Sequence, residues 1–197
     1  MRERIRVGGL ISGRGSNMNA LIAAAADPAY PAEIVLVLSN NPDAQGLETA
    51  AKAGIRALAI DQRPFKGDRE AHEKALDAAL RAAEVDLVAL AGYMRIFTPW
   101  FVGVWSGRML NIHPSLLPHF TGVDTHARAL AAGHKTHGCT VHWVTDELDA
   151  GPIIGQAEVP VLPGDDENTL AARVLEAEHR LYPECLAKAA LDFRTAD

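Results

Sequence analysis

The side chains best suited to chemistry at a carbonyl group lie in the segment 108–115, which reads RMLNIHPS. Side chains alternate between the two faces of a strand, so we expect Asn111 and His113 on one face and Leu110 and Ile112 on the other. An amide N–H can donate to a developing oxyanion, and an imidazole can carry a proton near neutral pH. The pair therefore fits acyl-type chemistry, although Asn111 alone is typical of a turn and His113 alone of a structural position.

An acidic loop, TDELDAGP at 145–152, follows a later predicted strand. A carboxylate of this loop brought close to His113 would orient the imidazole ring and favour its protonated form. The alternative interpretation is an exposed and solvated acidic turn, which is the more ordinary reading of such a loop on its own.

A glycine-rich loop, SGRGSN at 12–17, separates the first predicted strand from the first predicted helix. Ligands of parallel α/β sheets bind beyond the carboxyl ends of the strands, and free amides at a helix start favour an anion. The loop lacks a P-loop lysine, Met18 replaces the third glycine of a dinucleotide fingerprint, and no acid follows in the segment 39–41. These features favour a phosphate site over a nicotinamide site. A plain turn capped by Ser16 remains the alternative.

Strand-like and helix-like segments alternate along the chain, and the strands are apolar on both faces. We predict strands at 5–11, 34–38, 55–60, 86–91, 108–113, 139–144 and 153–159. We predict helices at 17–26, 44–53, 68–84, 126–132 and 167–190. Such a pattern is typical of a parallel sheet covered by helices on both sides. We therefore expect a single α/β domain over 1–197, with a doubly wound, mostly parallel, Rossmann-like sheet flanked by helices.

Composition limits the kinds of binding partner and the cellular compartment that we expect for this chain. The formal net charge is -6 and no block of Lys and Arg stands out, so a nucleic-acid or anionic-membrane surface is not expected. Cys139 and Cys185 lie far apart, which favours a reducing compartment. The apolar run 5–11 after Met1–Arg4 is too short for a signal peptide, and no run approaches the roughly 20 apolar residues of a spanning helix. We expect a cytoplasmic protein.

Three histidines, His134, His137 and His142, cluster in the sequence. Gly133 and Gly138 interrupt any helix that could present them together to a metal, so we expect surface positions for His134 and His137 and no metal site. His142 lies on the strand that leads to the acidic loop and could support the site.

Four segments together resemble the phosphoribosylglycinamide formyltransferases, which belong to the folate-dependent formyltransferases. They are SGRGSN at 12–17, AGYMRIFTP at 91–99, LNIHPSLLP at 110–118 and HGCTVHWVTDELDAGPII at 137–154. The resemblance covers essentially the whole chain. It implies transfer of a formyl group from 10-formyltetrahydrofolate, a co-substrate, to the amine of phosphoribosylglycinamide in purine biosynthesis. It also implies an N-terminal half that binds the phosphorylated substrate and a C-terminal half that is catalytic and binds folate.

The resemblance implies roles for individual residues as well. The catalytic residues would be Asn111, His113 and Asp149. The substrate would be bound by Gly15, Ser16, Asn17 and Glu178. The folate would be bound by Arg69, Met94, Arg95, Ile96, Phe97, Asn111, Thr145, Asp146, Glu147, Leu148 and Asp149. No metal is required, the partners are small molecules, and the oligomeric state is left open.

A few positions depart from the family pattern. Leu175 stands where a Lys or Gln usually helps to hold the substrate, FTG at 120–122 replaces Tyr-Pro-Gly, and Asp124 stands where His is often found.

Three other functions remain open. A formyl-folate hydrolase would not need the phosphate loop, a transformylase acting on initiator tRNA would carry a further basic domain, and a nucleotide-binding module would not need the Asn, His and Asp set.

Overall fold

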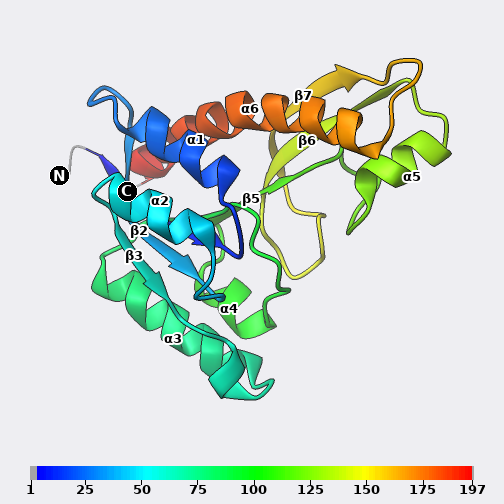
Figure 1. The fold of residues 1–197 in the computed structure, drawn as a ribbon. Helices are drawn as coiled ribbons and strands as arrows, with labels where there is room; N and C mark the ends of the chain where they lie inside the picture. The colour runs from blue at the N-terminus through cyan, green and yellow to red at the C-terminus, as the bar shows by residue number, and fades with distance from the viewer. Residues whose placement is uncertain (1–3, 197) are drawn as a thin grey trace.

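Seven strands form one sheet in the order β3-β2-β1-β4-β5-β6-β7 in the computed structural model, which describes residues 4–196 (Figure 1). The strands are β1 (Ile5–Ile11), β2 (Ala32–Ser39), β3 (Arg56–Ala59), β4 (Leu87–Leu90), β5 (Met109–His113), β6 (Thr136–Trp143) and β7 (Ile153–Pro160). The helices are α1 (Ser16–Ala25), α2 (Gln45–Lys52), the 3-10 turn η1 (Arg63–Phe65), α3 (Arg69–Ala82), α4 (Pro99–Val104), α5 (Thr125–Ala131) and α6 (Glu167–Ala196).

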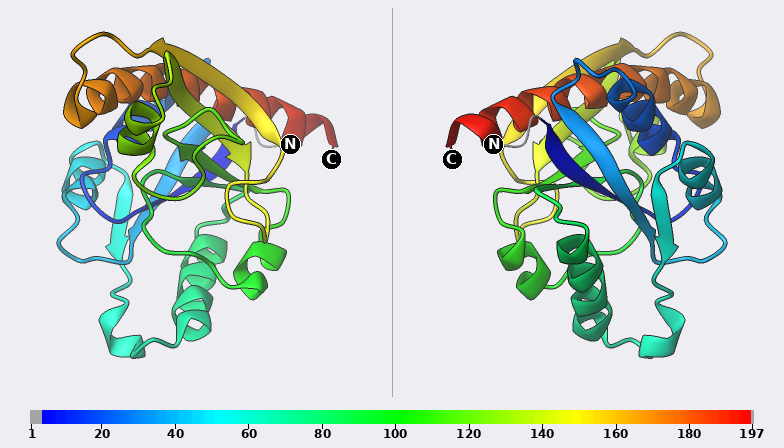
Figure 2. Two further views of the ribbon diagram at one scale, coloured as in Figure 1. Left: turned by 90° about the vertical axis from the view of Figure 1, so that its right-hand side faces the viewer. Right: turned by 90° about the vertical axis from the view of Figure 1, so that its left-hand side faces the viewer.

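Helices cover both faces of the sheet. The views in Figure 2 show α1, α2 and α6 on one face and α3 and α4 on the other, with a separate apolar core under each set. Strands β1 to β5 pair in parallel, while β6 and β7 add as antiparallel strands at one edge. The expected doubly wound, mostly parallel α/β domain is confirmed.

Two adjacent glycines in β1 explain how closely the helices approach the sheet. A Cβ atom on Gly8 would lie 2.5 Å from the side chain of Leu80 on α3. One on Gly9 would lie 2.1 Å from the side chain of Met18 on α1. Because successive strand residues face opposite sides, the pair gives room to one helix on each face of the sheet.

The predicted strands and helices correspond to observed elements, with small shifts at their ends. Helix α4 and the turn η1 were missing from the prediction. Thr98 followed by Pro99 is a helix-start signal that could have revealed α4, but the six-residue helix is too short to show a periodic pattern. The last helix extends beyond the expected end at 190. Met1–Glu3, which entered the signal-peptide argument, lie outside the described residues.

The carboxyl ends of the parallel strands bring three loops to one edge of the sheet. These loops are the glycine-rich loop after β1, the segment 91–98 after β4 and the loop 114–124 after β5. The loop 144–152 between β6 and β7 folds back along β5, where Val144 N donates to the carbonyl of Met109.

Within residues 4–196, no helix has both the length and the apolar character that crossing a bilayer requires.

Candidate active site

The alternation of β5 places its polar and apolar side chains on opposite faces. Leu110 and Ile112 are buried in the core beneath α1 and α6. Asn111 and His113 therefore project to the other face, where Asn111 is half-buried and His113 is buried. Both side chains lie beside the loops at the carboxyl end of the strand.

His113 lies between a carboxylate and a backbone carbonyl. Its Nδ1 atom is 3.5 Å from Oδ2 of Asp149, and its Nε2 atom donates to the carbonyl oxygen of Phe120 at 2.9 Å. Both ring nitrogens thus face acceptors, and only an imidazolium ring has a proton for each. The arrangement suits a cationic donor in a buried site.

Asp149 is fixed by its backbone and by the loop after β5. Its φ angle of 53° lies in the left-handed region, and its Oδ2 atom accepts a hydrogen bond from Gly122 N at 2.8 Å. The side chain is buried. A buried carboxylate requires such partners, so the loop 114–124 and the loop 144–152 hold each other in place through this residue.

His142 on β6 completes the group. Its Nδ1 atom donates to the Trp143 carbonyl at 2.9 Å, which leaves Nε2 of the neutral ring as an acceptor for Nδ2 of Asn111 at 3.4 Å. Burial lowers the pKa of His142, although its bond to Trp143 and the Asp149 carboxylate, 3.9 Å away, oppose that shift. A neutral His142 orients the Asn111 amide and leaves its second N–H free for a ligand.

The glycine-rich loop borders a hollow of about 250 Å³. It is lined by Ser12, Gly13, Arg14, Gly15, Ser16, Asn17, Ala91, Gly92 and Met94. Gly15 precedes helix α1 with a φ angle of 68°, and no side chain caps the helix. Ser16 is the first helical residue and not the cap, so the expected capping of the turn by Ser16 is wrong. The uncapped amides of the first turn remain available to an anion.

Glu178 on α6 reaches the same loop from the far end of the sequence. Its Oε2 atom accepts a hydrogen bond from Nδ2 of Asn17 at 2.7 Å, and Oδ1 of Asn17 is buried without a partner. Burial raises the pKa of the Glu178 carboxyl, and the hydrogen bond from Asn17 opposes this. The structure thus brings together the predicted substrate-binding residues Gly15, Ser16, Asn17 and Glu178.

The segment after β4 presents part of the predicted folate set. Met94 and Ile96 are exposed by 73% and 63%. Phe97 instead stacks between Tyr93 and Phe101, with ring centroids 5.0 and 4.5 Å apart. Phe97 is therefore a support for the segment, while Met94 and Ile96 are open to a ligand.

Two buried residues of α3, His72 and Glu73, hold this segment and were missed by the sequence reasoning. His72 Nε2 donates to the Ile60 carbonyl at 2.7 Å, so Nδ1 can accept from Arg95 Nη1 at 3.4 Å. The Glu73 carboxylate accepts from Thr98 N at 2.8 Å and from the Thr98 hydroxyl. His72 and Glu73 are polar residues within the predicted helix 68–84, so nothing in the sequence marked them as buried. The predicted folate residue Arg69 is exposed one helical turn before His72.

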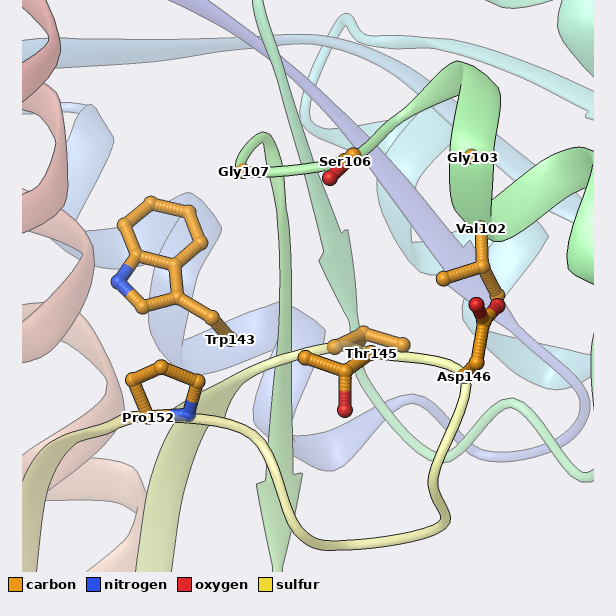
Figure 3. A pocket seen from close by; sticks show the side chains of 9 residues that line it. Val102, Gly103, Ser106, Gly107, Trp143, Thr145, Asp146 and Pro152 are labelled. Carbon is orange, nitrogen blue, oxygen red and sulfur yellow. The ribbon is translucent and has the colours of Figure 1, made fainter.

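The acidic loop opens into a second hollow of about 430 Å³. Figure 3 shows it between α4 and the loop 144–152, with Trp143 and Pro152 at one end and Val102 and Asp146 at the other. Thr145 and Asp146 line this hollow. The remaining loop residues Glu147 and Leu148 are exposed. The predicted folate residues therefore border two separate hollows.

His137 contradicts the expected surface position. It is only 1% exposed, and its Nε2 atom lies 3.2 Å from Nδ1 of His126. Burial, followed by the neighbouring His126, lowers the pKa of His137 to about 4. The reason is that β6 turns this residue toward α5, whereas the nearby glycines suggested an exposed turn. His134 is half-buried, and no group of three or more potential metal ligands occurs between residues 4 and 196.

This fold, with an Asn, His and Asp group at the end of β5 and a glycine-rich loop after β1, is that of a group-transferring α/β enzyme. The family described as Formyl transferase matches residues 5–186, and the chain belongs to it.

Among its relatives is the phosphoribosylglycinamide formyltransferase of Escherichia coli, 48% identical over 88% of this chain and 82% of that protein. A crystal structure of the Brucella melitensis phosphoribosylglycinamide formyltransferase is 56% identical over 95% of this chain and 96% of that one, with a TM-score of 0.91. The trifunctional purine biosynthetic protein of Drosophila melanogaster is 49% identical over 94% of this chain. The chain spans only 14% of the length of that relative.

Proposed function

We propose that this chain transfers the formyl group of 10-formyltetrahydrofolate to the amine of phosphoribosylglycinamide, a step of purine biosynthesis. The observation that carries the proposal is the contact between Asp149 and His113, with Asn111 and His142 beside them. The names of the relatives support the same reaction. The two substrates are the expected small-molecule partners, and the cytoplasm is the expected location.

The reaction needs an oxyanion to be stabilised and one proton to be moved. The amine nitrogen attacks the formyl carbon and forms a C–N bond, and the carbonyl oxygen becomes negative in the tetrahedral intermediate. The Asn111 amide and an imidazolium at His113 would donate to that oxygen. To do so, the His113 ring must exchange its bond to the Phe120 carbonyl for one to the substrate.

Collapse of the intermediate breaks the bond between the formyl carbon and the folate nitrogen. The attacking amine loses one proton and the departing folate nitrogen gains one, so no net acid or base is consumed. His113, or a water held by Asp149, would carry this proton. If His113 carries it, the ring gives its proton to the folate nitrogen and regains one from the amine, while Asp149 keeps the ring oriented and favours its protonated form.

The acceptor would bind at the glycine-rich loop. The amides of Gly15, Ser16 and Asn17 would hold its phosphate, since the uncapped first turn of α1 offers free donors to an anion. Glu178 and the partnerless Asn17 Oδ1 atom would face its amine-bearing end. Leu175 is half-buried one turn before Glu178 and cannot donate a hydrogen bond to the substrate.

The folate would bind along the segment 94–97 and the loop 145–149. We assign this role to Arg69, Met94, Arg95, Ile96, Phe97, Asn111, Thr145, Asp146, Glu147, Leu148 and Asp149, with Phe97 acting through its support of the segment. Exposed apolar side chains at Met94, Ile96 and Leu148 offer contact to a flat aromatic ring system. In this assignment the N-terminal half binds the phosphate and the C-terminal half is catalytic and binds folate, with Glu178 reaching across.

A formyl-folate hydrolase is the second candidate, because water could attack the same formyl carbon at the same residues. Incubation with 10-formyltetrahydrofolate, with and without phosphoribosylglycinamide, distinguishes the two when tetrahydrofolate release is followed. We expect release to depend on the acceptor and to match the formylated product mole for mole. Equal release without the acceptor would favour the hydrolase.

A further inference from the structure

A row of side-chain hydrogen bonds crosses the carboxyl ends of four neighbouring strands. Gln62 lies beyond β3, Asn40 follows β2, Ser12 follows β1 and Met94 lies beyond β4. Asn40 Nδ2 donates to Gln62 Oε1 at 3.0 Å, Ser12 Oγ donates to Asn40 Oδ1 at 2.6 Å, and Met94 N donates to Ser12 Oγ at 2.8 Å. The order of the row is the order of the strands in the sheet.

All the bonds in this row run in one direction. Met94 N–H can only donate, so Ser12 Oγ accepts from it, and the hydroxyl still has its own proton, which it donates to the Asn40 oxygen. The NH2 group of Asn40 faces the Gln62 oxygen. Asn40 is only 4% exposed, so water competes little with the bonds that this side chain makes, whereas the bond between Met94 and Ser12 lies at the surface.

Backbone hydrogen bonds brace the same four segments. Ser12 N donates to the Gly92 carbonyl at 3.1 Å, and Gln62 N donates to the Asn40 carbonyl at 3.2 Å. Asn41 Nδ2 donates to the Ser12 carbonyl at 3.4 Å. Ser12 is therefore bonded through its amide, its carbonyl and its hydroxyl to the segments on either side.

Ser12 joins the two segments to which we assign the two substrates. It begins the glycine-rich loop, and its hydroxyl holds Met94, the first residue of the folate segment 94–97. Both segments line the same hollow of about 250 Å³. Ser12 therefore connects a ligand that contacts one segment to the other segment.

We propose that Ser12, supported by Asn40 and Gln62, is a positioning residue that couples the acceptor site to the folate site. The proposal rests on the proposed function. Binding of the acceptor fixes the glycine-rich loop and so supplies part of the ordering that folate binding to 94–97 otherwise requires. Because such coupling is reciprocal, each ligand tightens the binding of the other by the same factor.

The test is a binding experiment without turnover. Tetrahydrofolate carries no formyl group, so its Kd can be measured with and without saturating phosphoribosylglycinamide. In the wild-type protein we expect the acceptor to tighten tetrahydrofolate binding about fivefold, at the lower end of usual couplings. In Ser12→Ala we expect the two Kd values to agree, and in the exposed control Thr49→Ala the wild-type factor to remain.

A second pair of variants separates positioning from general damage. Asn40→Asp keeps an acceptor for the Ser12 hydroxyl and should retain most of the coupling, whereas Asn40→Leu should lose it. A folded Ser12→Ala or Asn40→Leu protein with wild-type coupling would overturn the proposal, as would a wild-type protein that binds both ligands independently. A wild-type protein that binds neither ligand and transfers no formyl group would overturn the proposed function as well.

Discussion

Asp149→Asn removes one negative charge from the candidate catalytic group with very little change in shape. Asn adopts the left-handed conformation of this position readily, and its oxygen can accept the hydrogen bond from Gly122 N. The fold should survive, so a loss of activity reports on the charge and its orientation of His113.

The size of the effect follows from the distance between the two groups. With the His113 nitrogen 3.5 Å from the carboxylate, an effective dielectric constant of about 20 gives an attraction of about 5 kcal/mol. The amide dipole of Asn retains part of it. We therefore expect about 3 to 4 kcal/mol less stabilisation of the transition state, a fall in kcat of roughly 10²- to 10³-fold.

The assay measures initial rates of tetrahydrofolate release at saturating levels of both substrates, together with thermal unfolding. Asp192→Asn, the same substitution at an exposed site near the end of α6, is the matched control and should keep wild-type kcat. If Asp149→Asn unfolds at the wild-type temperature and keeps more than a tenth of kcat, the ionic pairing with His113 does not drive the reaction.

Four further predictions follow from the site and its surroundings. His113→Ala and Asn111→Ala should each lower kcat about 10²-fold or more with the circular dichroism spectrum unchanged, and near-normal turnover in either would remove it from the oxyanion site. Burial raises the pKa of Glu178 in the folded protein above its ordinary 4.5. The protonated carboxyl therefore stabilises the fold fully below pH 4.5, and this contribution is lost as the pH rises through the raised pKa. Glu178→Gln should raise Tm at pH 8 but not at pH 4, and should also raise the acceptor KM. An unchanged Tm at both pH values would mean that ionisation of Glu178 does not destabilise the folded protein. Burial lowers the pKa of His72 below its ordinary 6.5, so acidification through that lowered value should protonate the ring against Arg95 and raise the folate KM more than the acceptor KM. His72→Gln should flatten that profile, and equal profiles in both proteins would contradict the prediction. A Cβ on Gly15 would lie 3.2 Å from Gly46 Cα at a φ of 68°, so Gly15→Ala should lose about 1–2 kcal/mol of stability, whereas Gly13→Ala, with open space around it, should affect only the acceptor KM; similar unfolding of both would show that the strain at Gly15 is absent.

The sequence predicted the layered architecture because buried parallel strands leave a continuous apolar signal between helices. It also predicted which residues of β5 share a face, since strand alternation is a local rule. Helix α4 was not predicted because six residues are too few to show a periodic pattern. The apolar residues that α4 adds to the core beneath α3 were therefore not predicted either.

Contacts between distant segments lay beyond sequence reasoning. His72 and Arg95 are 23 residues apart, and their pairing depends on the packing of α3 against the segment after β4. The burial of His137 depends likewise on α5, whose His126 contacts it. The row from Gln62 to Met94 requires the strand order, because only neighbouring strands place their following residues within hydrogen-bond distance.

The hydrogen bond between Asn17 and Glu178 spans 161 positions of the sequence. One of its partners lies in α1, near the start of this domain, and the other lies in α6, which follows every strand of the sheet. During synthesis, the glycine-rich loop and α1 are therefore made well before the carboxylate that contacts them. Under the proposed function, a nascent domain would lack Glu178 at the acceptor site until α6 has left the exit tunnel and packed against α1.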